Sequence, residues 1–194
     1  MALAVVLLAA GGSSRMRGRD KLLEQVNGIE LLRHLALEAL AAGLGPVAVT
    51  LRPDAPGRSD ALAGLGLTTL LVPDADEGMA ASLRTAARWA LATGAEGLMV
   101  TPADLPELTA RDFATLASTF TPDGPPLRAT AQDGTPGHPV LFPAHLLPEF
   151  ATLTGDRGAQ PVLLRHPPRL VALPASHATT DLDTPEDWSA WRNR

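Results

Sequence analysis

The feature that most constrains the fold is a regular alternation of short apolar runs with segments of helical spacing. Apolar runs of strand length occur at Val5–Leu8, Pro46–Leu51, Leu67–Val72 and Gly97–Thr101. Helix-like segments are expected at Ile29–Leu40, Ala80–Ala92 and Thr109–Phe120. Runs that are apolar at consecutive positions suit strands covered on both faces. The sequence therefore predicts an α/β protein with a mostly parallel sheet and helices on both faces.

The ends of the expected helices carry local signals. Gly43 is a natural stop for the first helix, and Thr109 suits a capping position, with Asp112 as the third helical residue. Thr184, followed by a proline and two acidic residues, predicts a further helix near the end of the chain. Asp54–Asp60, by contrast, is rich in Pro, Gly and charge, so we expect a loop there.

The pattern changes after Thr121. A polar Pro/Gly loop precedes two expected strands, Leu127–Ala131 and His138–Phe142, on either side of a turn at Gly134–Gly137. Later prolines limit the length of regular elements. We therefore expect a single domain, residues 1–194, in which the second half is a lid or subdomain built onto the sheet of the first.

Composition excludes several classes of function. The 194 residues include 16 Lys plus Arg against 21 Asp plus Glu, a net charge of -5 that argues against a nucleic-acid partner. Cysteine is absent, which removes thiol nucleophiles and thiolate metal sites, and the five histidines lack zinc-binding spacing. The lack of cysteine also agrees with a reducing, cytoplasmic location.

The apolar stretch Ala2–Ala10 is expected to be a buried first strand. No basic residue precedes it, whereas a secretory signal carries positive charge at that place. The stretch is also too short to span a bilayer, and no membrane partner is expected.

The turn after this first strand is the strongest functional signal. Its sequence is Leu8-Ala9-Ala10-Gly11-Gly12-Ser13-Ser14-Arg15, and Lys21 follows. Small residues let backbone N–H groups approach an anion, while the serines add hydroxyl donors and the basic side chains add charge. The pattern is neither a P-loop nor a Gly-x-Gly-x-x-Gly dinucleotide motif. We expect an anion site here, because ligands lie beyond the carboxyl ends of parallel strands; the alternative is a flexible turn with solvated basic residues.

Carboxylates form the second signal. Asp104 follows the strand Gly97–Thr101, so it should lie at the same sheet edge as the basic turn, where it could hold a hard cation against phosphate oxygens. The alternative is a turn aspartate that bonds its own backbone. Asp181 and Asp183 are not explained by the nearby helix start, and one of them is a candidate second metal ligand.

Weaker signals for ligand-binding residues are found at Gly78–Ser82 and at His138. The first opens a helix, whose free N–H groups suit either a ligand or a cap. The histidine either faces a substrate or is structural. A hydrolase with a nucleophile elbow is disfavoured, because Gly-x-Ser-x-Gly does not occur.

In their order along the chain, these motifs resemble those of the MobA/MocA-type nucleotidyltransferases. The resemblance rests on Leu-Ala-Ala-Gly-x-Ser-x-Arg-Met at 8–16, Lys21-Leu22-Leu23, Gly78-Met79-x-x-Ser82-Leu83, Ala103-Asp104-Leu105-Pro106, Gly137–Phe142, Gly155–Ala159 and Asp181–Asp187. The later motifs resemble those of the molybdenum-cofactor cytidylyltransferase branch more than those of the guanylyltransferase branch. Ala10 does so too, because the guanylyltransferase branch usually has a second glycine there.

The resemblance implies a Rossmann-like sheet of the nucleotide-diphospho-sugar transferase type. It also implies transfer of a nucleoside monophosphate from an NTP, here CTP, to the phosphate of molybdopterin with release of pyrophosphate, and a molybdenum enzyme as a further partner. Residues of about 1–120 would bind the NTP, and those of about 121–194 the acceptor.

The resemblance further implies a role for each matching residue. Arg15, Lys21 and Asp104 would be catalytic, Asp104 and Asp183 would hold Mg²⁺, and His138 and Asp156 would face the acceptor. The NTP would be bound by Leu8, Ala9, Ala10, Gly11, Gly12, Ser13, Ser14, Gly78 and Ser82.

Two departures from the family pattern leave the acceptor open. Gln160 stands where an arginine is common, and Thr101-Pro102 precedes Asp104 where other small residues are common. The alternatives are a GTP-dependent molybdopterin guanylyltransferase and a non-catalytic nucleotide- or cofactor-binding chaperone for a molybdenum enzyme. A plain interaction domain explains none of the three polar sites.

Overall fold

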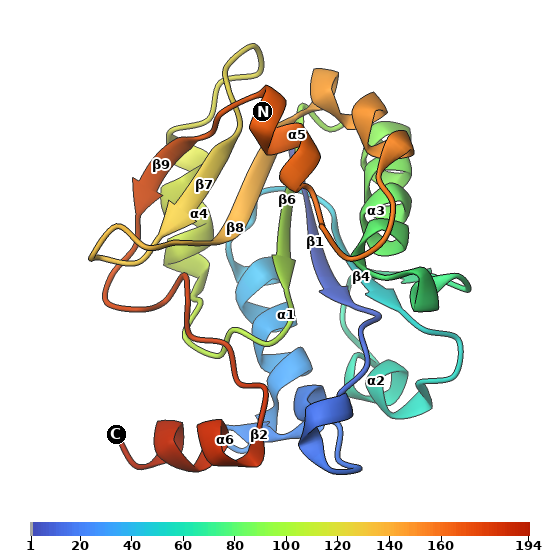
Figure 1. Cartoon of the computed structure of the whole chain (residues 1–194), viewed down its shortest axis with the longest axis vertical. Coiled ribbons are helices and arrows are strands. Elements are labelled where there is room, and N and C mark those ends of the chain that lie inside the picture. Colours follow the sequence, from blue (N-terminus) through green and yellow to red (C-terminus); the bar gives the residue numbers. More distant parts are fainter. Residues whose placement is uncertain (1) are drawn as a thin grey trace.

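In this computed structural model the chain is described from residue 2 to residue 194, apart from the side chain of Ser14. The chain forms a central seven-stranded sheet in the order β5-β4-β1-β6-β8-β7-β9. Figure 1 shows β4, β1, β6, β8, β7 and β9 side by side in that order. The strands are β1 (Leu3–Ala9), β4 (Val47–Leu51), β5 (Thr68–Leu71), β6 (Gly97–Pro102), β7 (Leu127–Thr130), β8 (Pro136–Pro143) and β9 (Arg169–Ala172). The predicted mostly parallel sheet is confirmed, since only β8 runs antiparallel to its neighbours.

Helices cover both faces of this sheet, as the sequence predicts. Along β1, Leu3, Val5 and Leu7 pack with α1 (Leu31–Ala41) and α4 (Ala110–Ser118), while Ala4 and Val6 pack with α3 (Met79–Thr93) on the other face. The remaining helices are α2 (Pro56–Ala61), α5 (Gln160–Arg165) and α6 (Pro185–Arg192), with short 3₁₀ segments η1 (Ser14–Met16), η2 (Lys21–Leu23), η3 (Ala75–Glu77) and η4 (Ala144–Thr152).

Local signals place most element boundaries. The cap at Thr109 is confirmed, because its hydroxyl accepts a hydrogen bond from the Asp112 N–H and the Asp112 carboxylate accepts one from the Thr109 N–H. The helix expected from Ile29 begins two residues later. Ile29–Glu30 is instead β3, paired with β2 (Gln25–Val26) in a small antiparallel ribbon.

The loop expected at Asp54–Asp60 is a wrong prediction in part, because α2 occupies most of it. Pro56 begins this helix, where a missing N–H removes no helical hydrogen bond. Arg58 and Ala61 are buried. A short helix with Pro, Gly, Ser and Asp has weak intrinsic propensity and depends on tertiary contacts, which composition does not reveal.

The second half of the chain extends the same sheet rather than forming a separate lid. β8 and β7 continue it beyond β6, and β9, which the sequence analysis did not anticipate, pairs in parallel with β7. β8 is longer than predicted despite Pro139. Its ladder with β7 shifts register between Arg128 and Thr130, and the proline falls within that interruption, where its missing N–H costs no ladder bond.

The order of the strands determines where a ligand can bind. The chain proceeds from β1 to β4 and β5 on one side, while β6 lies on the other side of β1. In open α/β sheets a crevice forms beyond the carboxyl ends of the strands where the order reverses. Those ends are at Ala9 and Pro102. Within residues 2–194, no helix combines the length and the apolar character that crossing a membrane requires.

Candidate active site

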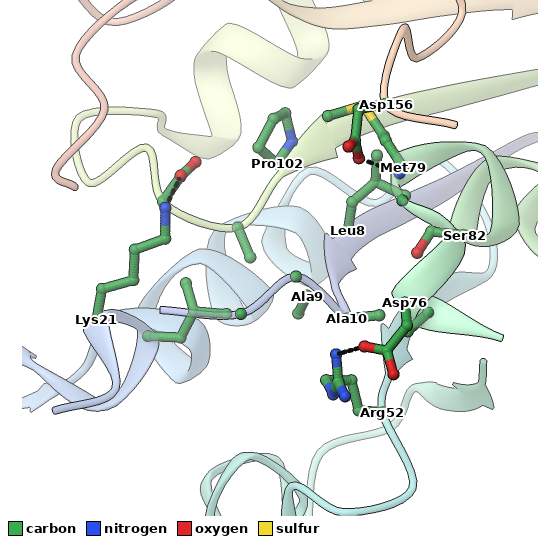
Figure 2. Close-up of a pocket in the computed structure, with 17 residues that line it drawn as sticks. Leu8, Ala9, Ala10, Lys21, Arg52, Asp76, Met79, Ser82, Pro102 and Asp156 are labelled. Atoms are coloured by element: carbon green, nitrogen blue, oxygen red, sulfur yellow. Dashed lines mark hydrogen bonds and ion pairs between the residues drawn. The ribbon is translucent and has the colours of Figure 1, made fainter. Parts of the chain in front are cut away.

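A cavity of about 450 Å³ lies beyond the carboxyl ends of β1 and β6 (Figure 2). Its walls come from the turn after β1, the start of α3 and the residues that follow β6. The predicted ligand-binding residues that line it are Leu8, Ala9, Ala10, Gly11, Gly12, Lys21, Gly78, Ser82, Asp104 and Asp156. The fold thus brings these distant segments together at the sheet edge where the sequence predicted a site.

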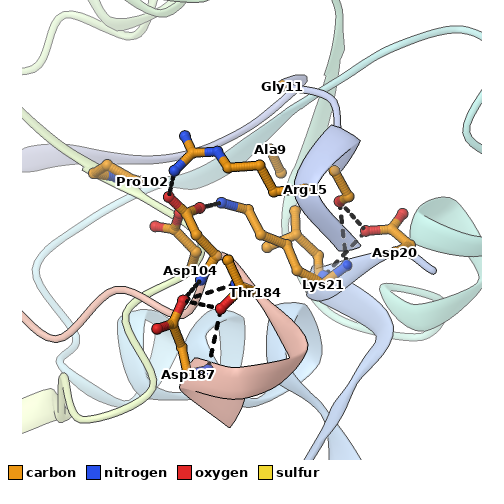
Figure 3. A network of polar contacts seen from close by, with 12 residues as sticks. Ala9, Gly11, Arg15, Asp20, Lys21, Pro102, Asp104, Thr184 and Asp187 are labelled. Carbon is orange, nitrogen blue, oxygen red and sulfur yellow. Dashed lines mark hydrogen bonds and ion pairs between the residues drawn. The ribbon is translucent and has the colours of Figure 1, made fainter. Parts of the chain in front are cut away.

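Lys21 lies between two carboxylates at one end of this cavity (Figure 3). Its Nζ is 2.6 Å from Asp104 Oδ2 and 2.5 Å from Asp183 Oδ1. The three side chains are mostly buried, with 15–20% of each exposed. Burial by itself lowers the pKa of Lys21, but the two carboxylates outweigh that effect and raise it. The ammonium therefore stays protonated at neutral pH.

Asp183 reaches this site because the end of the chain returns across the sheet edge. The Leu182 N–H donates to the Asp104 carbonyl at 3.4 Å, and the Thr184 side chain then caps α6. Arg15 approaches the same carboxylate from η1, with its Nη1 2.6 Å from Asp183 Oδ2, while its side chain stays 70% exposed. Of the two aspartates that the sequence left open, Asp183 is the one in contact with Lys21.

The carboxylates fit a hard cation that binds together with a phosphate-bearing ligand. Within the described residues, no group of three or more His, Cys, Asp or Glu side chains is arranged to hold a metal. The oxygens of Asp104 and Asp183 nevertheless converge on one point, where the Lys21 ammonium lies. Magnesium is commonly held by one or two carboxylates, with water and substrate phosphates as the other ligands. The two aspartates supply that number of protein ligands.

The turn after β1 exposes backbone toward the cavity. Gly11 and Gly12 are exposed, and a Cβ at either position would meet no atom within 4 Å. Packing against the protein therefore does not require glycine here. The space that the missing side chains leave is available to a ligand that approaches the backbone closely.

The neighbouring serines are less available than the sequence analysis expected. The Ser13 hydroxyl donates to Asp20 Oδ1 at 3.0 Å and accepts from the Lys21 N–H at 3.1 Å. Its contacts shape the turn and place the start of η2. The Ser14 side chain, a predicted phosphate donor, lies outside the described residues.

Asp156 and Gly78 meet at the start of α3. Asp156 Oδ1 accepts a hydrogen bond from the Met79 N–H at 3.3 Å, and the Gly155 carbonyl accepts one from the Ala80 N–H at 3.0 Å. Gly78 has a φ of 112°, and a Cβ there would overlap the Asp156 side chain and the Gly155 backbone. A residue predicted to face the acceptor therefore also caps the helix that borders the first cavity.

We expect Gly78→Ala to separate the loop at 155–158 from α3. The positive φ and the overlap should reduce the free energy of unfolding by about 1–3 kcal/mol and raise the KM for the nucleotide about tenfold. Steady-state kinetics and denaturant unfolding measure these effects. Gly94→Ala is the matched control: Gly94 has a φ of 71° at the other end of the same helix, with open space around its Cα. Equal KM values in the two variants would contradict the assignment.

A second cavity of about 440 Å³ adjoins the first and shares Leu8, Met79 and Asp156 with it. Its walls are mainly apolar, and Arg128 from β7 and His138 from β8 line it. His138 Nδ1 is buried, with no hydrogen-bond partner among the described residues. Burial, followed by the positive charge of Arg128, lowers the pKa of His138 to about 4, so the ring is neutral at neutral pH.

Sequence reasoning missed four charged residues around the first cavity. Arg58 of α2 and Asp20 hold the turn after β1 from behind. Arg52 and Asp76, which line the cavity, form an ion pair of 2.8 Å (Figure 2). Asp20 and Arg52 lie in loops, Asp76 in η3 and Arg58 in α2. None of them belongs to a recognisable motif, so the local signal of each is weak. Only Arg52, directly after β4, occupies a place that the topology rule favours.

The fold, the exposed glycine turn and the lysine held between two carboxylates define a nucleotide-binding α/β protein of the transferase class. The chain belongs to the family of MobA-like NTP transferase domains, whose model matches residues 5–170. It is therefore a nucleotidyltransferase, and it has the fold of the nucleotide-diphospho-sugar transferases that the sequence predicted.

Three comparisons support this placement. The molybdenum cofactor guanylyltransferase of Cereibacter sphaeroides (strain ATCC 17029) is 29% identical over 186 residues, which are 94% of this chain and 91% of that relative. The crystal structure of Rv0371c from Mycobacterium tuberculosis H37Rv superposes with a TM-score of 0.85 at 29% identity, covering 100% of this chain and 98% of the other. A structure of Rv0371C from Mycobacterium tuberculosis H37Rv in complex with manganese superposes with a TM-score of 0.77 at 26% identity, covering 98% of this chain and 97% of the other.

Proposed function

We propose that this nucleotidyltransferase transfers GMP from GTP to the phosphate of a molybdopterin-type acceptor and releases pyrophosphate. The observation that carries the proposal is Lys21, fixed between Asp104 and Asp183 at the edge of a cavity lined by the glycine turn. This arrangement supplies fixed positive charge and two carboxylates beside a space of nucleotide size. The name of the 29% identical relative from Cereibacter sphaeroides supports both the guanylyl group and the acceptor.

On the nucleotide side, the turn from Ala10 to Gly12 binds the triphosphate through backbone N–H groups. Arg15 holds the β- and γ-phosphates, and Lys21 lies at the α-phosphate, where negative charge increases in the transition state. A divalent cation held by Asp104 and Asp183 neutralises phosphate charge when it is bound. We propose Mg²⁺, and the manganese complex of a 26% identical protein supports a divalent cation in general.

Gly78 and Ser82 contact the base or the ribose in this proposal. Both line the first cavity, at the start and in the first turn of α3. Only 5% of Ser82 is exposed, although the residue borders the cavity. Backbone and hydroxyl groups of this kind can recognise a base edge without carrying charge.

On the acceptor side, the second cavity takes the ring system of the acceptor. Its apolar walls suit a flat heterocycle, and the neutral His138 offers a hydrogen bond to it. Arg128 and Asp156 border the same space, and Asp156 also borders the nucleotide cavity. The acceptor phosphate would therefore reach the nucleotide along the wall that the two cavities share, formed by Leu8, Met79 and Asp156.

The reaction requires two anions to approach each other in line. An oxygen of the acceptor phosphate forms a bond to the α-phosphorus of GTP as the bond from that phosphorus to the bridging oxygen of the β-phosphate breaks. Pyrophosphate leaves with the electron pair of the broken bond. Lys21 and Arg15 stabilise the charge on the α-phosphate and on the leaving group, and the two adjoining cavities hold the reactants in alignment.

CTP is the second candidate nucleotide, and Ala10 is the residue that favours it. Ala10 is 2% exposed and packs with Val72 and Ala81 where the turn borders the cavity. The guanylyltransferase branch that the chain resembles usually has glycine there. CTP, expected from the sequence, therefore stays a prediction beside the GTP that we propose.

A competition assay among the four NTPs tests the choice. With molybdopterin and Mg²⁺ present, we expect a kcat/KM for pyrophosphate release at least about tenfold higher with GTP than with CTP. A preference for CTP would contradict the proposal and support the sequence-based alternative. Nucleotide binding without release of pyrophosphate from any NTP would instead indicate a non-catalytic chaperone.

A further inference from the structure

Arg58 is a buried cation outside both cavities, and no step of the proposed reaction uses it. Only 4% of the residue is exposed, although it comes from the short helix α2. Its guanidinium contacts the turn that follows β1, but Arg58 itself is not among the residues that line the first cavity. A buried charge is costly unless it is paired and hydrogen-bonded, so its contacts need an explanation.

The guanidinium makes five hydrogen bonds, all to groups that hold the nucleotide-binding turn. Nε and Nη2 form a fork on the Asp20 carboxylate, at 2.7 and 3.0 Å. Nη2 also donates to the Ser13 hydroxyl at 3.3 Å. Nη1 donates to the carbonyl oxygens of Ala9 at 2.6 Å and Gly11 at 2.8 Å. Every N–H of the side chain is therefore used within one short segment.

The two carbonyl contacts decide which way the turn faces. In a trans peptide unit the C=O and the next residue's N–H point in opposite directions. Because Arg58 holds the carbonyls of Ala9 and Gly11, the N–H groups of Ala10 and Gly12 point away from it. Both of these residues line the first cavity. The exposed glycines alone would allow many conformations, and this contact selects one that presents alternate N–H groups to an anion.

We infer that Arg58 is a positioning residue that orients the backbone N–H groups of the nucleotide-binding turn, with Asp20 as its counterion. Asp20 balances the buried charge, and Arg58 in turn, against the effect of burial, lowers the pKa of that carboxyl. Asp20 also accepts from the Leu22 N–H at 3.0 Å, so the same pair sets the start of the segment that carries Lys21. The inference rests on the proposed role of the turn.

Arg58→Met tests this inference, and Arg33→Met is its matched control. Arg33 also donates from one Nη1 to two carbonyls two residues apart, those of Ala61 at 2.8 Å and Ala63 at 3.0 Å, but it does not contact the turn. We expect Arg58→Met to lower kcat/KM for the nucleotide about 100-fold through misplaced N–H groups, mostly by raising KM. Arg33→Met should stay within about threefold of the unchanged protein. Equal kinetics in the two variants would overturn the inference.

Two further measurements keep the test decisive if Arg58→Met folds poorly. Arg58→Lys keeps the charge near Asp20 but loses the planar fork. We therefore expect a loss in kcat/KM of about tenfold, between the losses expected for Arg58→Met and Arg33→Met. Hydrogen exchange of the Lys21 and Leu22 N–H groups, which donate to Ser13 and Asp20, should become faster in both Arg58 variants of the nucleotide-free full chain and remain unchanged in Arg33→Met. Unchanged exchange would overturn the inference, whichever nucleotide or acceptor the enzyme uses. If the Arg58 variants exchange faster but the unchanged protein binds no NTP, the proposed function is refuted and the positioning role of Arg58 is not.

Discussion

Lys21→Ala should lower kcat for pyrophosphate release about 10²–10³-fold. The ammonium is the charged group nearest to the converging carboxylates, and it is mostly buried, so its interaction with the α-phosphate is weakly screened. Its raised pKa keeps it charged across the neutral range, and pH between 6 and 9 should not change the size of the loss. Single-turnover measurements at saturating nucleotide isolate this effect on the chemical step.

Arg17→Ala is the control for a general loss of positive charge near the turn. Arg17 is 73% exposed and, among the described residues, pairs only with Glu186 at 2.7 Å, so salt and water already screen it. We expect this variant to stay within about twofold of the unchanged protein. If Lys21→Ala folds normally and turns over as fast as Arg17→Ala, the assigned role of Lys21 is wrong. Circular dichroism and thermal unfolding of both variants establish that they fold.

The sequence predicts the first half of the sheet because each of its signals is local. Leu3–Ala9 is apolar at every position, and small residues follow at once, so the strand and its exposed turn can be recognised within ten residues. The Thr109 cap depends on a partner three residues away. β9 carries no comparable signal. It is a short edge strand with three of its four residues exposed, and its pairing with β7 is formed across about forty residues of chain.

The sequence predicts those site residues that lie just beyond the carboxyl ends of the strands, because they meet at one edge of the sheet. Gly11 and Asp104 directly follow the ends of β1 and β6, so topology alone places them together. Lys21 lies in η2, and contacts with Ser13 and Asp20 hold the start of η2. Asp183 is different, because only the return of the chain and the Leu182–Asp104 backbone contact decide between it and Asp181. Arg58 has no local signal at all. Its function in the turn depends on a helix that composition predicted to be a loop.

Asp104→Asn should have the largest effect of any carboxylate substitution. We expect kcat to fall about 10³-fold and the concentration of Mg²⁺ or Mn²⁺ needed for half-maximal rate to rise at least about tenfold. The amide keeps the volume of the side chain but removes its charge, and a neutral oxygen is a poorer ligand for a hard cation. Lys21 keeps Asp183 as a partner, so the fold should be retained. Pyrophosphate release over a range of metal concentrations gives both values.

Asp181→Asn and Asp183→Asn separate the metal-binding role of Asp104 from a general effect of local charge. Asp183 contacts both Lys21 and Arg15, so its amide variant should also shift the metal requirement upward, by a smaller factor. Partial burial and the nearby negative charge of Asp104 raise the pKa of Asp181, but Lys21 pairs with Asp104 and Asp183 rather than with Asp181. Asp181→Asn should therefore leave the metal requirement unchanged. An equal shift in all three variants would mean that net charge, rather than ligation by Asp104 and Asp183, controls the metal dependence.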